Sequence, residues 1–272
     1  MLKIIRESFK LTNSNIVIAT PLIFFSIISS LYLIFSSGGS TIGLIFSAVL
    51  FFLMLGAFLS GWFYMIANVV REPEIEDNKL ITDFPSGVGE YFLAILGMIV
   101  NVVIISAIIF VSTVYIGKKL IGGFGISYTQ FVDAAQSVEA MKAFVESLTN
   151  EQLIKINYWN LLFFCSVILN YFILILYPSV ILFKEKNPYK ALIINLKDTF
   201  GHRVFKNVGL FLIVFILYLA VSLFTALVGK NIFAHFVLTL VNFYYMTYVG
   251  VLIFNYYYSN FIKIGSNVDT TV

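Results

Sequence analysis

Six long apolar stretches of this chain contain no Asp, Glu, Lys or Arg in their central parts. A helix needs about 20 predominantly apolar residues to cross the hydrocarbon of a bilayer, so each stretch predicts a transmembrane helix. The fold class that follows is all-α: a polytopic six-transmembrane helical bundle with short amphipathic helices at the membrane interface. The predicted spans cover residues 15–35, 42–70, 91–117, 158–183, 208–228 and 234–258.

The composition agrees with a chain that lies mostly in lipid. Of the 272 residues, 60% are hydrophobic and only 11% are charged, which is far from the average of soluble domains. No Pro-rich, Ser-rich or like-charged linker divides the chain, so we predict a single integral membrane domain over residues 1–272. The net charge of +3 is spread along the sequence, whereas nucleic-acid binding needs a concentrated basic surface. We therefore expect no nucleic-acid partner.

The basic residues are distributed unevenly between the two sides of the predicted spans. The N-terminal segment, the loops 71–90 and 184–207 and the C-terminal tail together carry twelve Lys and Arg, whereas the other side, which includes Lys230, carries five. Loops rich in Lys and Arg stay in the cytosol. This distribution predicts a multi-pass protein of the cell (plasma) membrane with both termini in the cytosol.

Three segments between the spans have their own patterns. Pro73 and the sequence Asp83-Phe-Pro-Ser-Gly predict an irregular 71–90 loop, and the glycines near Gly122 should end the third span. In the outer segment 126–157, apolar residues recur at steps of three and four, and Thr149-Asn-Glu-Gln152 has the form of a capping box. We therefore expect an outer helical hairpin there, made of one amphipathic helix and a second helix that runs into the fourth span. The apolar positions are Phe131, Ala135, Val138, Met141, Val145 and Leu148.

The second cytosolic loop contains the pattern of a short interfacial helix over residues 188–200. Asn187 and Pro188 are typical of an N-cap followed by the first helical position, and an apolar stripe runs from Tyr189 to Phe200. Two interpretations remain open: a basic segment that only fixes topology, or one that contacts anionic lipid or a partner. The candidate lipid contacts are Lys184, Lys186, Lys190, Lys197, Arg203 and Lys206.

The polar side chains inside the spans are amides, hydroxyls and phenols. Asn101, Asn170 and Asn242 are the candidate intramembrane polar contacts. Such groups commonly form hydrogen bonds between helices, and the alternative is that they line a cavity for a substrate. The phenols of Tyr244 and Tyr248 also need partners, for which Asn side chains or backbone carbonyls would serve.

No arrangement typical of catalysis or metal binding occurs in the sequence. His202 and His235 fall at opposite ends of spans, so about 30 Å of hydrocarbon separates them. The chain contains no H-E-x-x-H or G-x-S-x-G motif. We therefore predict that the protein is not an enzyme, and we assign no catalytic, cofactor-binding or metal residue and no cofactor.

One region resembles a known kind of protein. The run Pro188-Tyr-Lys-Ala-Leu-Ile-Ile-Asn-Leu-Lys-Asp-Thr-Phe-Gly-His-Arg-Val-Phe-Lys follows a span that contains Pro178. Residues 181–211, with a looser echo at residues 80–97, resemble the juxtamembrane helix of uncharacterised prokaryotic six-span membrane proteins. Those include proteins similar to the membrane domain attached to some glycerophosphodiesterases. The resemblance implies the six-span fold but no activity, because the hydrolase domain is not part of it.

Two functions follow from these patterns. The first is a non-enzymatic membrane subunit or scaffold, whose partners would be the lipid bilayer, anionic lipid, and a membrane protein or a second copy of the chain. The alternative is a small transporter or permease component for a neutral solute or lipid, because no buried charge is present to couple ions. A polar cavity bordered by Asn101, Asn170 or Asn242 would favour transport, whereas a packed interior would favour the scaffold.

Overall fold

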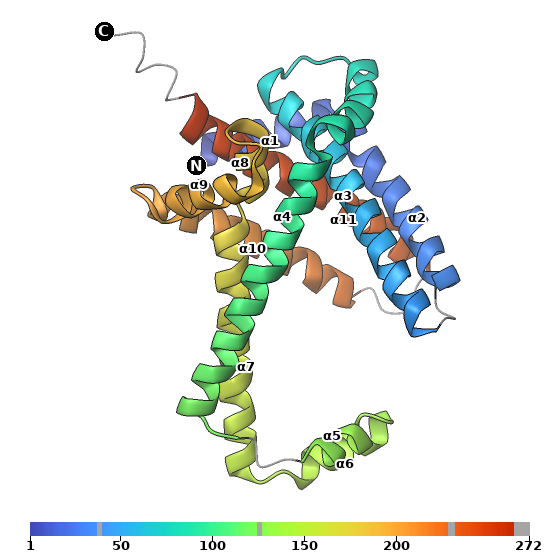
Figure 1. Cartoon of the computed structure of the whole chain (residues 1–272), viewed down its shortest axis with the longest axis vertical. Helices are drawn as coiled ribbons and strands as arrows, with labels where there is room; N and C mark the ends of the chain where they lie inside the picture. Colours follow the sequence, from blue (N-terminus) through green and yellow to red (C-terminus); the bar gives the residue numbers. More distant parts are fainter. Residues whose placement is uncertain (37–39, 124–126, 228–231, 264–272) are drawn as a thin grey trace. The chain divides into compact units, whose positions relative to one another are not determined.

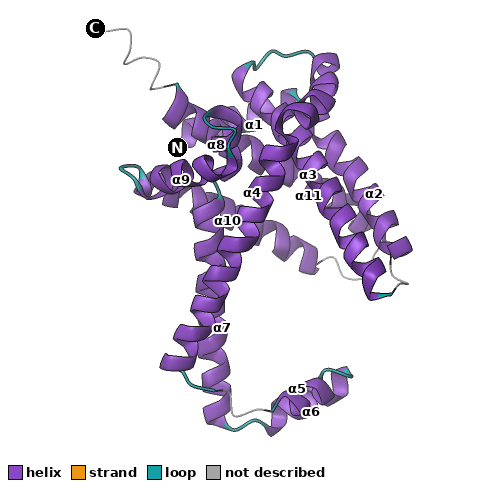
Figure 2. Ribbon diagram, viewed as in Figure 1, coloured by secondary structure: helices purple, strands orange, loops and turns teal. Residues whose placement is uncertain are grey.

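The structure is a computed structural model that describes residues 1–36, 40–123, 127–227 and 232–263. These residues form helices joined by short loops and contain no strand (Figure 2). Six helical segments are long and apolar enough to cross a membrane, which confirms the all-α, six-span fold class. The segments are Ile16–Ile34, Thr41–Arg71, Asp77–Leu120, Asn150–Phe183, Val204–Ala226 and Phe233–Ile262. Lys230 and Gly125 lie outside the described residues.

The chain divides into two compact units, and α4 and α7 each run from one unit into the other. Unit 1 consists of Met1–Asn101 and Ile173–Val272, and unit 2 consists of Val102–Phe172. The single membrane domain stays a prediction. The helices, drawn in Figure 1, are α1 (Leu2–Ser14), α2 (Thr20–Ser36), α3 (Thr41–Arg71), α4 (Asp77–Leu120), α5 (Tyr128–Ala134), α6 (Val138–Ser147), α7 (Asn150–Leu174), α8 (Tyr177–Phe183), α9 (Pro188–Phe200), α10 (Val204–Leu227) and α11 (Ile232–Tyr257), with a 3₁₀ turn η1 (Ile16–Ala19) and a π-helical turn η2 (Tyr258–Ile262).

The prediction of an irregular 71–90 loop is wrong beyond residue 76, because α4 begins at Asp77 and contains Pro85. Proline normally breaks a helix interior at a cost of about 3 kcal/mol, so packing must hold this turn. The first turns of α4 pack closely against α3 at two glycines. The ring of Phe84 occupies the space that a side chain on Gly61 of α3 would need, and Tyr64 of α3 occupies the corresponding space beside Gly87 of α4. Asn68 also donates a hydrogen bond to Asp83 at 2.8 Å. These contacts with α3 maintain the helix through the proline.

An N-terminal helix that the sequence analysis did not predict, α1, packs along α11. Asn255 donates to the hydroxyl of Ser8 at 3.0 Å. The phenols of the sixth span find the kinds of partner that the sequence suggested: Tyr244 donates to Asn13 Oδ1 at 2.6 Å, and Tyr248 lies 3.5 Å from the carbonyl oxygen of Ile5. The amphipathic helix α1 is therefore part of unit 1.

The buried core of unit 1 gathers at one end of its helices. Fully buried side chains include Met65 of α3, Ile181 of α8 and Tyr256 of α11. Arg71 and the basic residues around α9 lie at the same end, because Arg71 Nη2 donates to the carbonyl oxygen of Leu182 at 2.7 Å. We call this region the basic end of unit 1. Toward their other ends the same helices expose large apolar side chains, such as Ile42, Phe46, Leu223, Phe224, Phe233 and Phe236.

Unit 2 contains the outer segment, which is a pair of short helices rather than one long amphipathic helix. The chain leaves the helical conformation between Ala134 and Val138, and the hydroxyl of Ser137 then caps α6 by accepting the N–H of Ala140. Two of the six residues of the predicted apolar stripe, Val138 and Val145, are exposed. The side chain of Phe131 is outside the described part of the structure. The glycine stop after the third span is present, since α4 ends at Leu120 and Gly122 has a φ of +83°.

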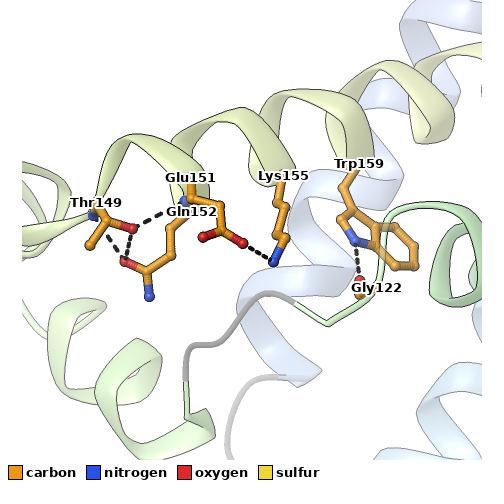
Figure 3. A network of polar contacts seen from close by, with 6 residues as sticks. All are labelled: Gly122, Thr149, Glu151, Gln152, Lys155 and Trp159. Atoms are coloured by element: carbon orange, nitrogen blue, oxygen red, sulfur yellow. Dashed lines mark hydrogen bonds and ion pairs between the residues drawn. The ribbon is translucent and has the colours of Figure 1, made fainter.

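The capping box predicted at Thr149 forms at the start of α7 (Figure 3). Gln152 Oε1 accepts the N–H of Thr149 at 2.9 Å, and the hydroxyl of Thr149 accepts the N–H of Gln152 at 3.3 Å. One turn further along, Lys155 forms an ion pair with Glu151. One turn beyond that, the indole N–H of Trp159 donates a hydrogen bond to the carbonyl oxygen of Gly122. The local sequence therefore sets both the start of α7 and its contact with the end of α4.

Candidate interaction surface around helix α9

Helix α9 is held by side-chain caps at both of its ends. At its N-terminus, Asn187 Oδ1 accepts the N–H groups of Tyr189 at 3.0 Å and Lys190 at 3.2 Å, and Pro188 occupies the first helical position. At its C-terminus, Asn207 Nδ2 donates to the carbonyl oxygens of Asp198 and Thr199. Helix ends otherwise leave such groups unpaired. The caps therefore fix where α9 begins and ends.

The small and polar side of α9 faces the protein. Ala191, Asn195 and Thr199 follow one another at four-residue steps, and all three are completely buried. Asn195 Nδ2 donates to the carbonyl oxygen of Ile173 at 2.7 Å. That carbonyl belongs to the last turn of α7, where Leu176 and the N-terminal proline of α8 interrupt the helix. The interruption in the fourth span thus supplies the polar partner that turns this face of α9 inward.

The apolar side of α9 is consequently turned outward. The exposed fractions of Tyr189, Ile193 and Phe200 are 64%, 55% and 51%, and that of Leu196 is 37%. These positions recur at steps of four, three and four, so they form one stripe on the helix. A helix in a water-soluble protein buries such a stripe. The stripe on α9 is instead available to lipid or to another apolar surface.

Among the predicted lipid contacts, Lys184 is engaged within the protein. Its Nζ lies 2.8 Å from Asp198 Oδ2, and the two side chains are only 27% and 17% exposed. The ammonium group also lies 5.2 Å from the ring centroid of Tyr257 and 5.3 Å from that of Phe261, which are cation–π distances. The hydroxyl of Tyr257 donates to the same carboxylate oxygen at 2.6 Å. Asp198 therefore links the α8–α9 loop to the end of α11.

Lys186 and Arg203 are engaged as well. Lys186 forms an ion pair with Glu90, and this hydrogen-bonded partner raises the pKa of the Lys186 ammonium. The Lys186 ammonium also lies 4.8 Å from the ring centroid of Tyr91. Arg203 donates to the carbonyl oxygen of Asn260 and stacks over Phe261. These two cations connect the 184–207 loop to α4 and to η2.

Lys190, Lys197 and Lys206 are exposed, and no ion pair joins them to another residue within the described ranges. Lys190 and Lys197 lie seven residues apart, on one flank of the apolar stripe. The only acidic residue between positions 186 and 206 is Asp198, which is already paired. We call the stripe Tyr189, Ile193, Leu196 and Phe200, together with Lys190 and Lys197, the α9 surface.

The three intramembrane amides have different surroundings. In unit 1, Asn101 is buried and donates to the hydroxyl of Tyr177 at 2.8 Å, and this hydroxyl in turn donates to the carbonyl oxygen of Pro188 at 2.6 Å. In unit 2, Asn170 donates to the hydroxyl of Ser106 at 2.9 Å. Asn242 in α11 is partly exposed, and among the described residues it has no hydrogen-bond partner. Two of the three amides thus bond to another segment of the chain.

Two surface hollows of unit 1 bear on the question of transport. The larger, of about 420 Å³, lies among η1, α2, α3 and the first turns of α4, and Thr20 is the one hydroxyl-bearing residue of its otherwise apolar lining. The smaller, of about 360 Å³, lies beside α4 and includes Glu90. Ala57 lines both. A cavity bordered by Asn101, Asn170 or Asn242 would favour transport. None of these three residues lines either hollow.

Sequence reasoning did not identify the residues that orient α9. Asn195 and Thr199 lie four residues apart on the side of α9 opposite the apolar stripe, and Asn207 follows at the start of the next span. This spacing was a usable signal, because an amide on a short helix between two spans can cap the broken ends of its neighbours. The partners of these residues come from other segments. The carbonyl of Ile173 accepts from Asn195, the hydroxyl of Tyr256 donates to Asn207 Oδ1 at 2.7 Å, and that of Tyr257 donates to Asp198, so pattern alone could not supply them.

Comparison with known proteins adds no relative, because no protein-family model, curated protein or solved structure matches the chain. The resemblance of residues 181–211 to six-span prokaryotic membrane proteins stays a prediction. In the part of the chain that the structure describes, His, Cys, Asp and Glu side chains do not gather in groups of three that could hold a metal ion.

Proposed function

We propose that the chain is a non-enzymatic subunit or scaffold of the plasma membrane, with the basic end of unit 1 in the cytosol. It would act by presenting a rigid cytosolic surface to a membrane protein or to a second copy of itself. The observation that carries this proposal is the concentration of buried side chains and polar cross-links at the basic end.

The lengths of the spans support an extramembrane role for that end. α3 has 31 residues and is therefore about 46 Å long, whereas the hydrocarbon core is about 30 Å thick. A helix of this length must tilt in the bilayer or project from it. The exposed apolar side chains of α3 and α11 lie toward the other ends of these two helices, so their packed basic end is the part that would project.

The cross-links support placing the predicted cytosolic segments together. Arg71 bonds to Leu182, Lys186 pairs with Glu90, and Ser8 bonds to Asn255. The N-terminal helix and both basic loops thus meet at one end of unit 1, as the positive-inside distribution requires of segments on one side of a membrane. The orientation follows from that rule and belongs to the proposal.

Chemical cross-linking in native membranes, followed by purification in mild detergent, tests the proposal. We expect a partner in fixed stoichiometry, with cross-links that map to Lys206, an exposed lysine of the basic end outside the α9 surface. The variant Asp198→Ala, which removes the link between α9 and α11, should reduce them. Lys118 and Lys119, at the far end of α4, serve as control positions. A protein that is monomeric and yields no cross-links at the basic end would overturn the scaffold.

The larger apolar hollow favours a second candidate, a transporter component for a neutral solute or lipid. Its lining could accommodate an apolar molecule, although the amides expected to border a transport cavity lie elsewhere. The test uses proteoliposomes that contain fluorescent phosphatidylcholine. If the protein is a scaffold, it should cause no more transbilayer movement of lipid than is seen in empty vesicles. Movement that is abolished by Ala57→Phe, which would place an aromatic ring at the lining shared by the two hollows, would establish transport and refute the scaffold.

A further inference from the structure

We propose that the α9 surface is a binding site for the anionic inner leaflet, in which the apolar stripe enters the bilayer interface while Lys190 and Lys197 contact lipid phosphates. This inference goes beyond the scaffold proposal and would stand if no protein partner were found. It also separates the six basic residues of the region into those that hold the protein together and those that face lipid.

The first support is the orientation of α9, which buried polar side chains determine. Asn195 and Thr199 face the protein, and the bonds from Asn195 to Ile173 and from Asn207 to the end of α9 oppose rotation about the helix axis. The exposed stripe is therefore a fixed feature of the fold. Turning it inward would leave the carbonyl of Ile173 without the amide that now bonds to it.

The second support is the position of α9 between two spans. The helix follows α8, which ends at Phe183, and precedes α10, which begins at Val204. Both of its ends are thus tied to segments that cross the membrane. An amphipathic helix in such a place can bury its apolar side about 5–10 Å into the boundary between headgroups and acyl chains.

The third support is charge. Lys184, Lys186 and Arg203 bond within the protein, whereas Lys190 and Lys197 are exposed beside the stripe and no acidic group on α9 remains to neutralise them. A lysine near an anionic leaflet contributes about 1 kcal/mol, which corresponds to about fivefold in affinity. The two lysines should together give about 25-fold preference for anionic lipid at low salt.

Lipid titrations of the purified full-length protein, followed by native mass spectrometry, test the charge. We expect phosphatidylglycerol to bind more tightly than phosphatidylcholine. The double variant K190Q/K197Q should lose most of this preference, and added salt should weaken it in the wild type. The control K118Q/K119Q removes the same charge at the other end of α4 and should leave the preference unchanged.

Spin labels test the depth of the stripe. In a Cys165→Ser background, a label at Ile193→Cys in nanodiscs that contain phosphatidylglycerol should be accessible to oxygen and protected from a water-soluble nickel reagent. A label at Lys190→Cys should be more accessible to the nickel reagent. Each spectrum also reports whether the variant is folded, because a label on an unfolded segment is highly mobile.

The proposal would be overturned by either of two results. One is equal anionic-lipid preference in the wild type and K190Q/K197Q. The other is a label at residue 193 that reaches the nickel reagent as readily as one at residue 190. Protection of residue 193 from both oxygen and nickel would show a protein partner in place of lipid, and it would also refute the proposal.

Discussion

Replacing Asp198 by Ala removes the carboxylate that joins three segments of unit 1. Its Oδ2 atom accepts hydrogen bonds from Lys184 at 2.8 Å and from Tyr257 at 2.6 Å. Tyr257 is completely buried, so its hydroxyl would lose its partner without gaining water. We therefore expect Asp198→Ala to lower the free energy of unfolding substantially.

The magnitude follows from the burial of the pair. Breaking a fully buried ion pair costs about 3–5 kcal/mol, and an unpaired buried hydroxyl costs about 1–3 kcal/mol. The side chains of Lys184 and Asp198 keep 27% and 17% exposure, so water compensates part of the loss. We expect a decrease of about 3 kcal/mol for Asp198→Ala. For Asp198→Asn, which keeps an oxygen acceptor, we expect about half of that.

The matched control is Glu72→Ala, which also lies in unit 1. Glu72 pairs with Lys79 at 2.7 Å, but its side chain is 62% exposed. Exposed pairs of this kind contribute little, because water screens the two charges. The two variants therefore break ion pairs of similar length in surroundings of very different exposure.

Unfolding by SDS in mixed micelles can follow unit 1 alone. Trp62 lies in unit 1 and is almost completely buried, and Trp159 is the other tryptophan of the chain. In a Trp159→Phe background, the fluorescence of Trp62 reports on the unit that contains Asp198. The reasoning is refuted if Asp198→Ala and Glu72→Ala shift the midpoint equally, or if adding Tyr257→Phe to Asp198→Ala costs as much as Tyr257→Phe alone.

Three further predictions concern the amides, the topology and pH. Asn101→Leu removes the bond to Tyr177 and should lower stability by about 1 kcal/mol in the same titration; an unchanged midpoint would contradict this. In a Cys165→Ser background, an impermeant maleimide added to intact cells should label Lys142→Cys but not Lys197→Cys, and the reverse pattern would invert the topology. The ion pair with Glu90 raises the pKa of Lys186 above its ordinary value of 10.5, so the stability due to this pair is present below that value and is lost as the pH rises through the raised pKa. Lys186→Met should therefore flatten the alkaline end of the stability profile, which a pH series of the titration measures.

The sequence by itself determined the spans, because the cost of placing charge in hydrocarbon leaves a signal in every 20-residue stretch. It also determined the local starts and stops of several helices. The caps at Asn187 and Thr149 and the stop before Gly122 each depend on residues a few positions apart, so neighbouring side chains are sufficient to specify them.

Only the tertiary structure decided the parts that depend on distant segments. Pro85 argued for a loop, but the close contacts of Gly61 with Phe84 and of Gly87 with Tyr64 hold α4 against α3 and maintain a helix there. The apolar stripe of α9 was visible in the sequence, whereas its outward direction depends on Ile173 and Asn207. Six basic residues looked equivalent until Asp198 and Glu90 were brought beside two of them. A hydrogen bond or ion pair across the fold needs a partner whose position no local pattern contains, so these features became visible only once the helices were packed.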